Sequence, residues 1–382
     1  MGDSMPAIEI HGTCDPRFQR LRDVFAKNFE AGHEVGASVA VSEDGEMVVD
    51  LWAGYADAAK SKPWQRDTIV LVFSTTKIMA TLCALMLIDR SELDIDAPVA
   101  RYWPEFAQKG KDKVLVRHIF NHSSGVPAWE PPIPFATTYD WDRTVESLAE
   151  QELWWEPGTQ SGYHSNTYGF LVGELIRRVS GKMPGVFLKE EVTSKIDADF
   201  YIGLPDEALP RFAEMIPMEE PRIWGEPGVL SERVENCLLP PAWKGLECLR
   251  SEMPGANGIG NARSLARIGA IVAMNGELDG HSFLSPQTID LALTEQSYRH
   301  DLVIDMPVRY GFGMGLNSKE FECPSDRSLH WGGAGGSLVI MDVNSGTCLA
   351  YAMNRMLPDL KEDIRNAALR AAYNAIVGTG RS

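Results

Sequence analysis

The sequence predicts a mixed α/β (α+β) fold in which both ends of the chain build one antiparallel sheet flanked by helices. Two observations carry this prediction. Strand-like runs joined by turn residues occur near both ends of the chain, and helical patterns with Pro/Gly-rich loops dominate from about residue 75 to 285. We therefore expect a sheet domain from residues 1–72 and 286–382, with an inserted, mostly helical domain from residues 73–285. A ligand site is expected in the cleft between the two.

The N-terminal part of the chain predicts a helix followed by a hairpin. In "DPRFQRLRDVFAKNF", Asp15 is suited to cap a helix and Pro16 to be its first residue. Large apolar residues then recur at helical spacing, at Phe18, Leu21, Phe25 and Phe29. The runs "GASVAVS" and "EMVVDLWAGYA", joined by "EDG", predict two paired strands.

The C-terminal part repeats this pattern in reverse order. The runs "GGSLVIMDV" and "TCLAYAMN" are joined by the turn residues "NSG" and predict a second hairpin. The segment "LKEDIRNAALRAAYNAIV", residues 360–377, then predicts a closing amphipathic helix. A sheet assembled from both ends of the chain accounts for all of these segments.

Composition excludes several classes of partner. The 382 residues carry a formal net charge of −17, which disfavours binding to nucleic acid or to an anionic membrane surface. The longest apolar run, around residues 78–88, is too short to span a bilayer. The N-terminal residues show neither a positive n-region nor an apolar h-region, so we expect a cytoplasmic protein.

Cysteine and histidine spacing gives no indication of a metal site. The six cysteines are scattered without a C-x-x-C pair, and H-E-x-x-H is absent. Cys83 and Cys348 lie in apolar runs and are expected to be core residues. We expect a reduced protein that needs no metal or other cofactor.

The strongest local signal for chemistry is the pair Ser74 and Lys77 in "LVFSTTKIMATLCALMLIDR". Residues three apart lie on one face of a helix, so the Lys77 amine can reach the Ser74 hydroxyl. Apolar surroundings would lower the pKa of Lys77 and make a neutral amine accessible as a base. Free N–H groups at the helix start would favour a developing oxyanion at Ser74.

The same motif also fits an ordinary helix start, with Ser74 as N-cap and Lys77 reaching solvent. A chain of this length should contain about one S-x-x-K by chance at average residue usage. Here Ser74 is the only serine followed by lysine three residues later. The motif alone leaves both readings open.

Longer stretches give the motif its context. The sequence resembles the serine β-lactamase/penicillin-binding-protein superfamily and, within it, the family VIII carboxylesterases, which are similar to class C β-lactamases. "STTK" matches the nucleophile motif, and "HWGGAGGSLVIMD" matches the strand that holds the third motif. Three further stretches are similar as well: "LVRHIFNHSSGVPAW", "WEPGTQSGYHSNTYGFLVGELIRRVSG" and "NGIGNARSLARIGAIVAMNGELDGHSFLSP".

The resemblance implies a β-lactamase/transpeptidase-like fold and a catalytic mechanism. Ser74 would attack an ester carbonyl, Lys77 and Tyr163 would shuttle the proton, and Tyr163 would activate water for deacylation. A free tyrosine, with a pKa near 10, is a poor base at neutral pH, so the charge of Lys77 is expected to lower the pKa of Tyr163. The backbone N–H groups of Ser74 and Ala334 would form the oxyanion hole. Without this context, Tyr163 would read as a core aromatic residue.

Two departures from the family pattern concern substrate binding. Ser165 stands where class C β-lactamases carry the asparagine of Y-x-N, and Trp331-Gly332-Gly333 stands in place of K-T-G. Both changes favour neutral esters over β-lactams. Gly332 and Gly333 suit a close approach of substrate to backbone, although they also fit a tight strand with a bulge. Asn354 is a further candidate for substrate binding, with a solvated strand end as the alternative.

Tryptophans near these motifs suggest a confined acyl pocket. Four of them are candidates for its lining, although core positions are the commoner fate of this residue: Trp129, Trp154, Trp155 and Trp331. If several line the cleft, short acyl chains should be preferred. We therefore expect a serine carboxylesterase that acts on a small-molecule ester and that can form homo-oligomers.

Three alternatives remain open at this point. A Ser-His-Asp triad could use His330, which lies beside the third motif, although a lone histidine is more often structural. The chain could instead be a β-lactamase or a D-alanyl-D-alanine peptidase, whose work is normally done outside the cytoplasm. It could also be a binding module that kept this fold and lost its chemistry, which the intact Ser74, Lys77 and Tyr163 argue against.

Overall fold

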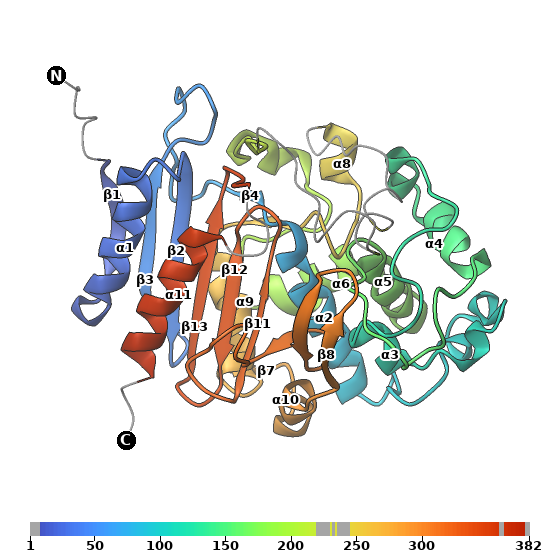
Figure 1. Ribbon diagram of the computed structural model, residues 1–382. Helices are drawn as coiled ribbons and strands as arrows, with labels where there is room; N and C mark the ends of the chain where they lie inside the picture. The colour runs from blue at the N-terminus through green and yellow to red at the C-terminus, as the bar shows by residue number, and fades with distance from the viewer. Residues whose placement is uncertain (1–7, 219–229, 231–233, 235–244, 359–362, 379–382) are drawn as a thin grey trace.

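The computed structural model describes residues 8–218, 230, 234, 245–358 and 363–378 (Figure 1). Within these residues a nine-stranded antiparallel sheet has the order β1-β3-β2-β13-β12-β11-β10-β9-β8. Its strands are β1 (Ile10–Cys14), β2 (Gly36–Glu43), β3 (Glu46–Gly54), β8 (Ser297–Asp301), β9 (Met306–Tyr310), β10 (Gly315–Leu316), β11 (Ser328–Gly332), β12 (Leu338–Asp342) and β13 (Thr347–Met353). The mixed α/β class and the sheet built from both ends of the chain are confirmed.

The α-helices flank the sheet and fill the other half of the molecule (Figure 1). They are α1 (Gln19–Glu30), α2 (Thr76–Asp89), α3 (Val116–Phe120), α4 (Trp141–Glu150), α5 (Thr167–Ser180), α6 (Pro184–Leu188), α8 (Leu246–Arg250), α9 (Ala262–Ala273), α10 (Pro286–Leu293) and α11 (Ile364–Val377). Two short strand pairs lie outside the main sheet, β4 (Val70–Leu71) with β5 (Ile259–Gly260) and β6 (Glu277–Leu278) with β7 (His281–Ser282).

The two predicted hairpins meet in the middle of the sheet. β2 pairs with β13 from Ala37 opposite Met353 to Glu43 opposite Thr347. Every residue of β13 is buried, because helices cover both of its faces. A strand that is buried on both sides is expected to read as a nearly continuous apolar run, as "TCLAYAM" does.

Successive residues of β13 show which helices cover which face. The Thr347 hydroxyl bonds the hydroxyl of Tyr373 on α11, so it faces the layer formed by α1 and α11. The next residue, Cys348, faces Gly269 of α9, where a Cβ would collide with the cysteine sulfur. The predicted burial of Cys348 in the core is therefore confirmed, and so is that of Cys83.

α9 corrects one proposed domain boundary. Gly269 also lies against the side chains of Val339 and Met341 of β12, so this helix packs on the sheet. Residues 262–273 nevertheless fall within the segment 73–285 that we assigned to the helical domain. The prediction of helical structure here is confirmed. An apolar period of 3.6 residues indicates a helix, but it does not indicate which part of the protein the helix packs against.

α2 lies between the sheet and the helical half of the molecule (Figure 1). Nearly all of its residues are buried, including the lysine at its second position. It packs against α5, α6 and α10, so it has no solvent face and no amphipathic pattern. The helix that follows Ser74 is therefore enclosed on all sides.

The predicted ends of α1 and α11 agree with the structure to within one helical turn. Asp15 accepts a hydrogen bond from the Arg17 amide, and Pro16–Phe18 form a 3-10 turn before α1 begins. The closing helix spans Ile364–Val377, while residues 360–362 of its predicted range lie outside the described part. Strands β1, β8 and β9 were not predicted.

Among the described residues, no helix combines the length and the apolar character needed to cross a membrane.

Candidate active site

Ser74 lies at the junction between the sheet and the central helix. It belongs to the 3-10 turn Phe73–Thr75, and α2 begins at the next residue. Phe73 has φ 48°, a left-handed conformation that is uncommon for a residue with a side chain. Ser74 itself is half-buried and lines a cavity of about 170 Å³. Such backbone strain beside a cavity is typical of functional positions.

Lys77 is completely buried directly beneath Ser74. Its Nζ lies 3.1 Å from the Ser74 Oγ, which confirms the contact expected from helical spacing. The same amine lies 2.6 Å from the carbonyl oxygen of Ser165 and 2.8 Å from that of Gly255. Burial lowers the pKa of Lys77 well below its ordinary value, in the direction expected from the sequence.

The contacts of the Lys77 amine fit its neutral form. An ammonium group has three N–H donors, whereas a neutral amine has two donors and one lone pair. The carbonyl oxygens of Ser165 and Gly255 can accept only, so they take two N–H groups. The third position faces the Ser74 hydroxyl, which can donate to the lone pair. The arrangement can therefore accept the serine proton.

Two glycines bring the Gly255 carbonyl to this position. A Cβ on Gly169 of α5 would collide with the Gly255 amide, so the loop and the helix approach as closely as they do because both residues lack side chains. The loop is fixed from within by Asn257, whose amide donates to the carbonyls of Cys248 and Ser251. Gly255 is thus a functional position that sequence reasoning missed.

Tyr163 completes a hydrogen-bonded group around Ser74. Its hydroxyl interacts with the Ser74 side chain and accepts from the Trp331 indole N–H at 3.3 Å. The Lys77 Nζ lies 4.8 Å from the centre of the Tyr163 ring. Ser74, Lys77, Tyr163 and Trp331 are therefore brought together, as the resemblance implied.

The expected effect on the pKa of Tyr163 is wrong. Burial raises the pKa of Tyr163 above its ordinary value, and the hydrogen bonds from Ser74 and Trp331 only partly oppose this. Lys77 does not lower it, because the same burial favours the uncharged lysine. Tyr163 is therefore a neutral phenol that can donate a proton, and the Lys77 amine is the group of the two that can accept one.

Two residues that sequence reasoning missed hold the backbone of Tyr163. The buried Asp301 accepts from the Tyr163 amide at 3.0 Å. His122 accepts from the Gly162 amide through its carbonyl and from the His164 amide through Nδ1, at 3.0 and 3.1 Å. His122 has φ 58° and lies within the quoted stretch "LVRHIFNHSSGVPAW", so its place in the motif was the available signal. No sequence signal indicated Asp301.

The proposed oxyanion hole lies on the turn that follows β11. Within this turn the Gly333 amide donates to the Ser337 carbonyl and the Gly336 amide donates to the Gly333 carbonyl. Among the backbone hydrogen bonds of the described residues, none uses the Ala334 amide. Ala334 lines the same cavity as Ser74, together with Gly332 and Gly333. A free N–H at this place can receive a carbonyl oxygen.

The cavity has an apolar side and a polar side. Ile304, Phe321, Trp331 and Leu338 supply the apolar lining. Asp363 and Asn366, at the start of α11, supply the polar lining. No lysine or arginine belongs to the lining found among the described residues. The cavity therefore offers no fixed positive charge to a substrate carboxylate.

Two predicted substrate contacts need correction. Asn354 is fully buried, accepts from the Gly36 amide and donates to the Tyr55 carbonyl, both at 3.0 Å, so it joins strand ends within the sheet. It does not line the Ser74 cavity. Ser165 reaches the site through its backbone carbonyl, which accepts from Lys77. Its hydroxyl is not part of the described lining.

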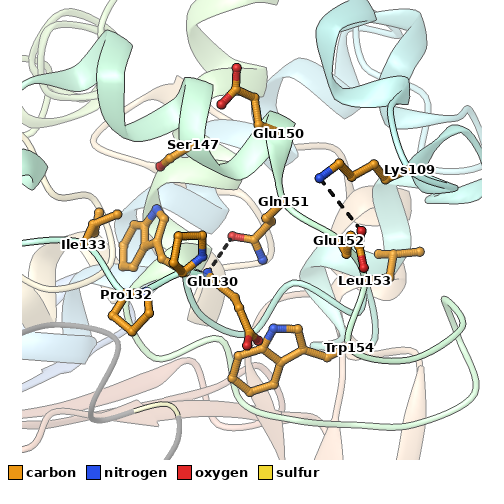
Figure 2. Close-up of a pocket in the computed structure, with 12 residues that line it drawn as sticks. Lys109, Glu130, Pro132, Ile133, Ser147, Glu150, Gln151, Glu152, Leu153 and Trp154 are labelled. Carbon is orange, nitrogen blue, oxygen red and sulfur yellow. Dashed lines mark hydrogen bonds and ion pairs between the residues drawn. The ribbon is translucent and has the colours of Figure 1, made fainter.

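Three of the four tryptophans also do not line this cavity. Only Trp331 does. Trp129 and Trp154 border a separate and larger cavity of about 750 Å³ beside α4 (Figure 2). Trp155 packs against Gly162 and donates to the Ser123 carbonyl. The narrowness of the Ser74 cavity therefore comes from phenylalanine, leucine and isoleucine side chains as much as from tryptophan.

The larger cavity differs in character from the one at Ser74. Figure 2 shows Lys109 paired with Glu152 at its edge, and the Gln151 side chain bonded to the backbone of Glu130. Both ends of the Gln151 amide group are used, one by the Glu130 amide and one by the Ala128 carbonyl. No nucleophile with an adjacent base belongs to its described lining. It does not compete with Ser74 as a catalytic site.

His330 does not form a triad with Ser74. Its ring stacks on Phe321 at 3.7 Å between centres, and its Nε2 lies 3.3 Å from the Leu316 carbonyl. Burial lowers the pKa of His330 to about 3. Among the described residues, its hydrogen-bond partners include neither Ser74 nor a carboxylate. His330 is part of the cavity wall.

Metal-ligating groups are not clustered in the part of the chain that the structure describes. No group of three or more His, Cys, Asp or Glu side chains there is arranged to hold an ion. The chemistry available at the site is that of a serine hydroxyl, a buried amine, a phenol and backbone amides.

Comparisons with known proteins identify the family of the chain. The beta-lactamase family model matches residues 21–373. The esterase/beta-lactamase LipL of Mycobacterium tuberculosis is 31% identical over 378 residues, which cover 92% of this chain and 84% of LipL. A family VIII carboxylesterase has a TM-score of 0.88 at 38% identity, covering 97% of this chain and 100% of that chain. A penicillin-binding protein homolog from Caulobacter crescentus has a TM-score of 0.90 at 36% identity, covering 96% and 100%. The chain therefore belongs to the beta-lactamase family and is a serine hydrolase.

Proposed function

We propose that the protein is a carboxylesterase that hydrolyses esters with short acyl chains through a Ser74 acyl-enzyme. The observation that carries this proposal is the 3.1 Å contact of the Lys77 amine with the Ser74 oxygen. Two carbonyl oxygens accept the other N–H groups of the amine, so in its neutral form Lys77 can take the serine proton. A serine activated by an adjacent base is what nucleophilic catalysis requires.

The proposed reaction has two halves. In the first, the Ser74 oxygen attacks the ester carbonyl and its proton passes to Lys77, while the amides of Ser74 and Ala334 stabilise the oxyanion. The proton then returns through Tyr163 to the alcohol oxygen, the C–O bond of the ester breaks, and the acyl group stays on Ser74. In the second half, water attacks the acyl carbonyl and gives its proton to Lys77 through Tyr163. The C–O bond to Ser74 then breaks, the proton returns to the serine oxygen, and the carboxylic acid leaves.

The cavity lining supports a neutral, short-chain substrate. Its volume of about 170 Å³ and its apolar side suit a small acyl group, and its described residues offer no cation to a carboxylate. The similar proteins include one named a family VIII carboxylesterase, and LipL is named an esterase/beta-lactamase. These names support an ester as the substrate class.

The alternative to an esterase with weak activity on β-lactams is a β-lactamase or a D-alanyl-D-alanine peptidase. The family and the name of LipL favour the first of these. Trp331, whose one indole N–H is donated to Tyr163, stands in place of a lysine that would give a β-lactam carboxylate a charge-assisted bond. The loss of such a bond costs about 1.5–3 kcal/mol, or roughly ten- to a hundredfold in rate. We expect slow hydrolysis of nitrocefin, well below the rate on p-nitrophenyl acetate or butyrate.

The test is a series of p-nitrophenyl esters of increasing chain length, with nitrocefin alongside, on wild type and Ser74→Ala. We expect peak kcat/KM at two to six carbons, and no activity or fluorophosphonate labelling in the variant. Activity above a few per cent in Ser74→Ala would mean that the nucleophile is another residue. Failure of a fluorophosphonate to label wild type would favour a binding module, and equal efficiency on nitrocefin would favour a β-lactamase.

A further inference from the structure

The C-terminal helix α11 contacts the oxyanion turn directly. The turn consists of Gly333, Ala334, Gly335 and Gly336, and the first residues of α11 lie against it. Arg365 donates from Nη2 to the Gly335 carbonyl at 3.0 Å, and Asn366 donates from Nδ2 to the Gly336 carbonyl at 3.2 Å. Two consecutive carbonyl groups of the turn are thus held by consecutive side chains of one helix.

The opposite side of the turn is held by the segment that carries the nucleophile. The Ser337 hydroxyl donates to the Val72 carbonyl at 2.7 Å and lies 2.9 Å from the Thr75 hydroxyl. Val72 and Thr75 flank the strained Phe73 and Ser74. The turn is therefore clamped between the serine segment on one side and α11 on the other.

This clamp determines where the Ala334 amide points. A peptide group is planar and trans, so the direction of the Gly333 carbonyl sets the direction of the Ala334 N–H. That carbonyl accepts from the Gly336 amide at 2.8 Å. Gly336 is in turn held by Asn366 and has φ 110°, and a Cβ on it would collide with Asp363 and Arg365. The geometry thus connects α11 to the oxyanion hole through one peptide plane.

Arg365 is itself rigidly placed. Its side chain is fully buried and is paired with two carboxylates, Glu34 at 3.2 Å and Asp363. It also donates to the Arg355 carbonyl at 2.8 Å. A guanidinium group presents its N–H donors in one fixed plane. Because these partners fix that plane, the remaining N–H of Nη2 points toward the Gly335 carbonyl.

We propose that Arg365 and Asn366 are positioning residues that align the Ala334 amide with the oxyanion of the reacting ester. This inference rests on the proposed function, since it assumes that the Ala334 amide is part of the oxyanion hole. It adds that the catalytic power of Ser74 depends on two side chains that lie about 290 residues further along the chain.

The test compares two asparagines on the same helix. Asn366 donates to the turn, whereas Asn374, two helical turns further on, donates to the Glu322 carbonyl at 2.9 Å and does not line the cavity. Asn366→Ala and Asn374→Ala each remove one amide-to-carbonyl bond from α11. We expect Asn366→Ala to lower kcat about tenfold with KM changed less than twofold, and Asn374→Ala to leave both unchanged. Thermal unfolding should shift similarly in both.

A boronic acid that forms a tetrahedral adduct with Ser74 gives the second measurement. Its affinity should fall in Asn366→Ala by the same factor as kcat, because both depend on the oxyanion contact. Asn366→Asp removes the same N–H donor and adds a negative charge beside the Gly336 carbonyl, so its kcat and boronate affinity should fall at least as far as those of the alanine variant. Arg365→Lys keeps the charge without the planar donor group and should also lower kcat more than it raises KM.

The outcomes separate this inference from the proposed function. Unchanged kcat and boronate affinity in both Asn366 variants would overturn the inference, while an inactive Ser74→Ala would still support the esterase mechanism. Equal losses of kcat in Asn366→Ala and Asn374→Ala would also overturn it, because the effect would then be one of helix stability. Full activity of Ser74→Ala would instead overturn the proposed function.

Discussion

Two fully buried basic side chains, Lys77 beside Ser74 and Arg365 against the turn that carries Ala334, have completely different surroundings. Lys77 is surrounded by a hydroxyl and two backbone carbonyls, and burial lowers its pKa well below the ordinary value. Burial opposes the charge of Arg365 as well, but Tyr351, Glu34 and Asp363 outweigh it and raise its pKa. Burial thus favours the neutral form of Lys77, whereas the acidic partners of Arg365 favour its charged form.

The difference shows how one protein uses the same residue class for chemistry and for structure. A buried amine without a carboxylate is a base, because desolvation favours its neutral form. A buried guanidinium with two carboxylates stays charged and fixes the position of neighbouring groups. Lys111 resembles Lys77 more than Arg365. Its amine donates to the Gln151 carbonyl, and burial lowers the pKa of Lys111 to about 8.

The largest effect is expected for Lys77→Met. The variant removes the base and keeps the volume, so kcat/KM on a short ester should fall on the order of 10²- to 10⁴-fold. Stability should change little, because relief from burying the amine offsets the loss of its bonds to the Ser165 and Gly255 carbonyls, and no buried carboxylate loses a partner. Steady-state kinetics on a short p-nitrophenyl ester measure the activity, and urea unfolding of the same preparation measures the stability. A variant that keeps a tenth of the activity would show that Lys77 is not the base.

Arg365→Met should show the opposite pattern in stability. Removing this cation leaves Glu34 and Asp363 buried without their partner, which costs about 3–5 kcal/mol in the free energy of unfolding. Urea unfolding measures the difference, with Lys77→Met as the matched buried-cation control. A loss below about 1 kcal/mol would mean that the Arg365 cluster adds no net stability, and the comparison with Lys77 would fail.

The pH dependence of stability should separate the two cations further. The folded state lowers the pKa of Lys77, so between that pKa and about 10.4 the unfolded state binds more protons. The free energy of unfolding contributed by Lys77 therefore rises with pH in this window, by up to about 1.4 kcal/mol per pH unit. Arg365 is protonated in both states there and contributes no slope.

Subtracting the unfolding data of Lys77→Met from those of wild type isolates this contribution. The same lowered pKa should appear as the acid limb of kcat/KM, since activity requires the neutral amine. A flat difference in stability from pH 6 to 10, or an acid limb near pH 10, would show that the ordinary pKa of lysine persists at this site.

The smallest effect is expected for Trp331→Phe. The variant removes the one N–H that Trp331 donates to Tyr163, so kcat/KM should fall about two- to tenfold. Trp141→Phe removes the indole bond to Glu174 on the helical side and is the matched control, for which we expect unchanged kcat/KM. A hundredfold loss in Trp331→Phe would mean that this neutral donor matters as much as a fixed cation would.

The sequence predicted what depends on neighbours along the chain. The Ser74–Lys77 contact follows from helical spacing, and the two central hairpins follow from alternation and turn residues. Tyr163 and Trp331 were assigned only through the resemblance, because about 90 and 250 residues separate them from Ser74.

Long-range packing explains what was missed or wrong. Asp301, Gly255 and Asn366 act through hydrogen bonds to segments far away in the sequence, and no local pattern marks them. Asn354 was expected at the substrate and lies within the sheet, since a strand end looks the same in sequence wherever it packs. The raised pKa of Tyr163 depends on burial, which the sequence around it does not specify.

The pairing of β2 with β13 has a consequence for protein synthesis. The hairpin of β2 and β3 leaves the ribosome about 300 residues before the strand that completes its hydrogen bonding, so one edge of β2 stays open for most of translation. At 5–20 residues per second this interval lasts about 15–60 seconds. The serine is synthesised early, but the turn and the helix that we assign to its oxyanion hole come last. A nascent chain therefore carries its nucleophile long before it can use it.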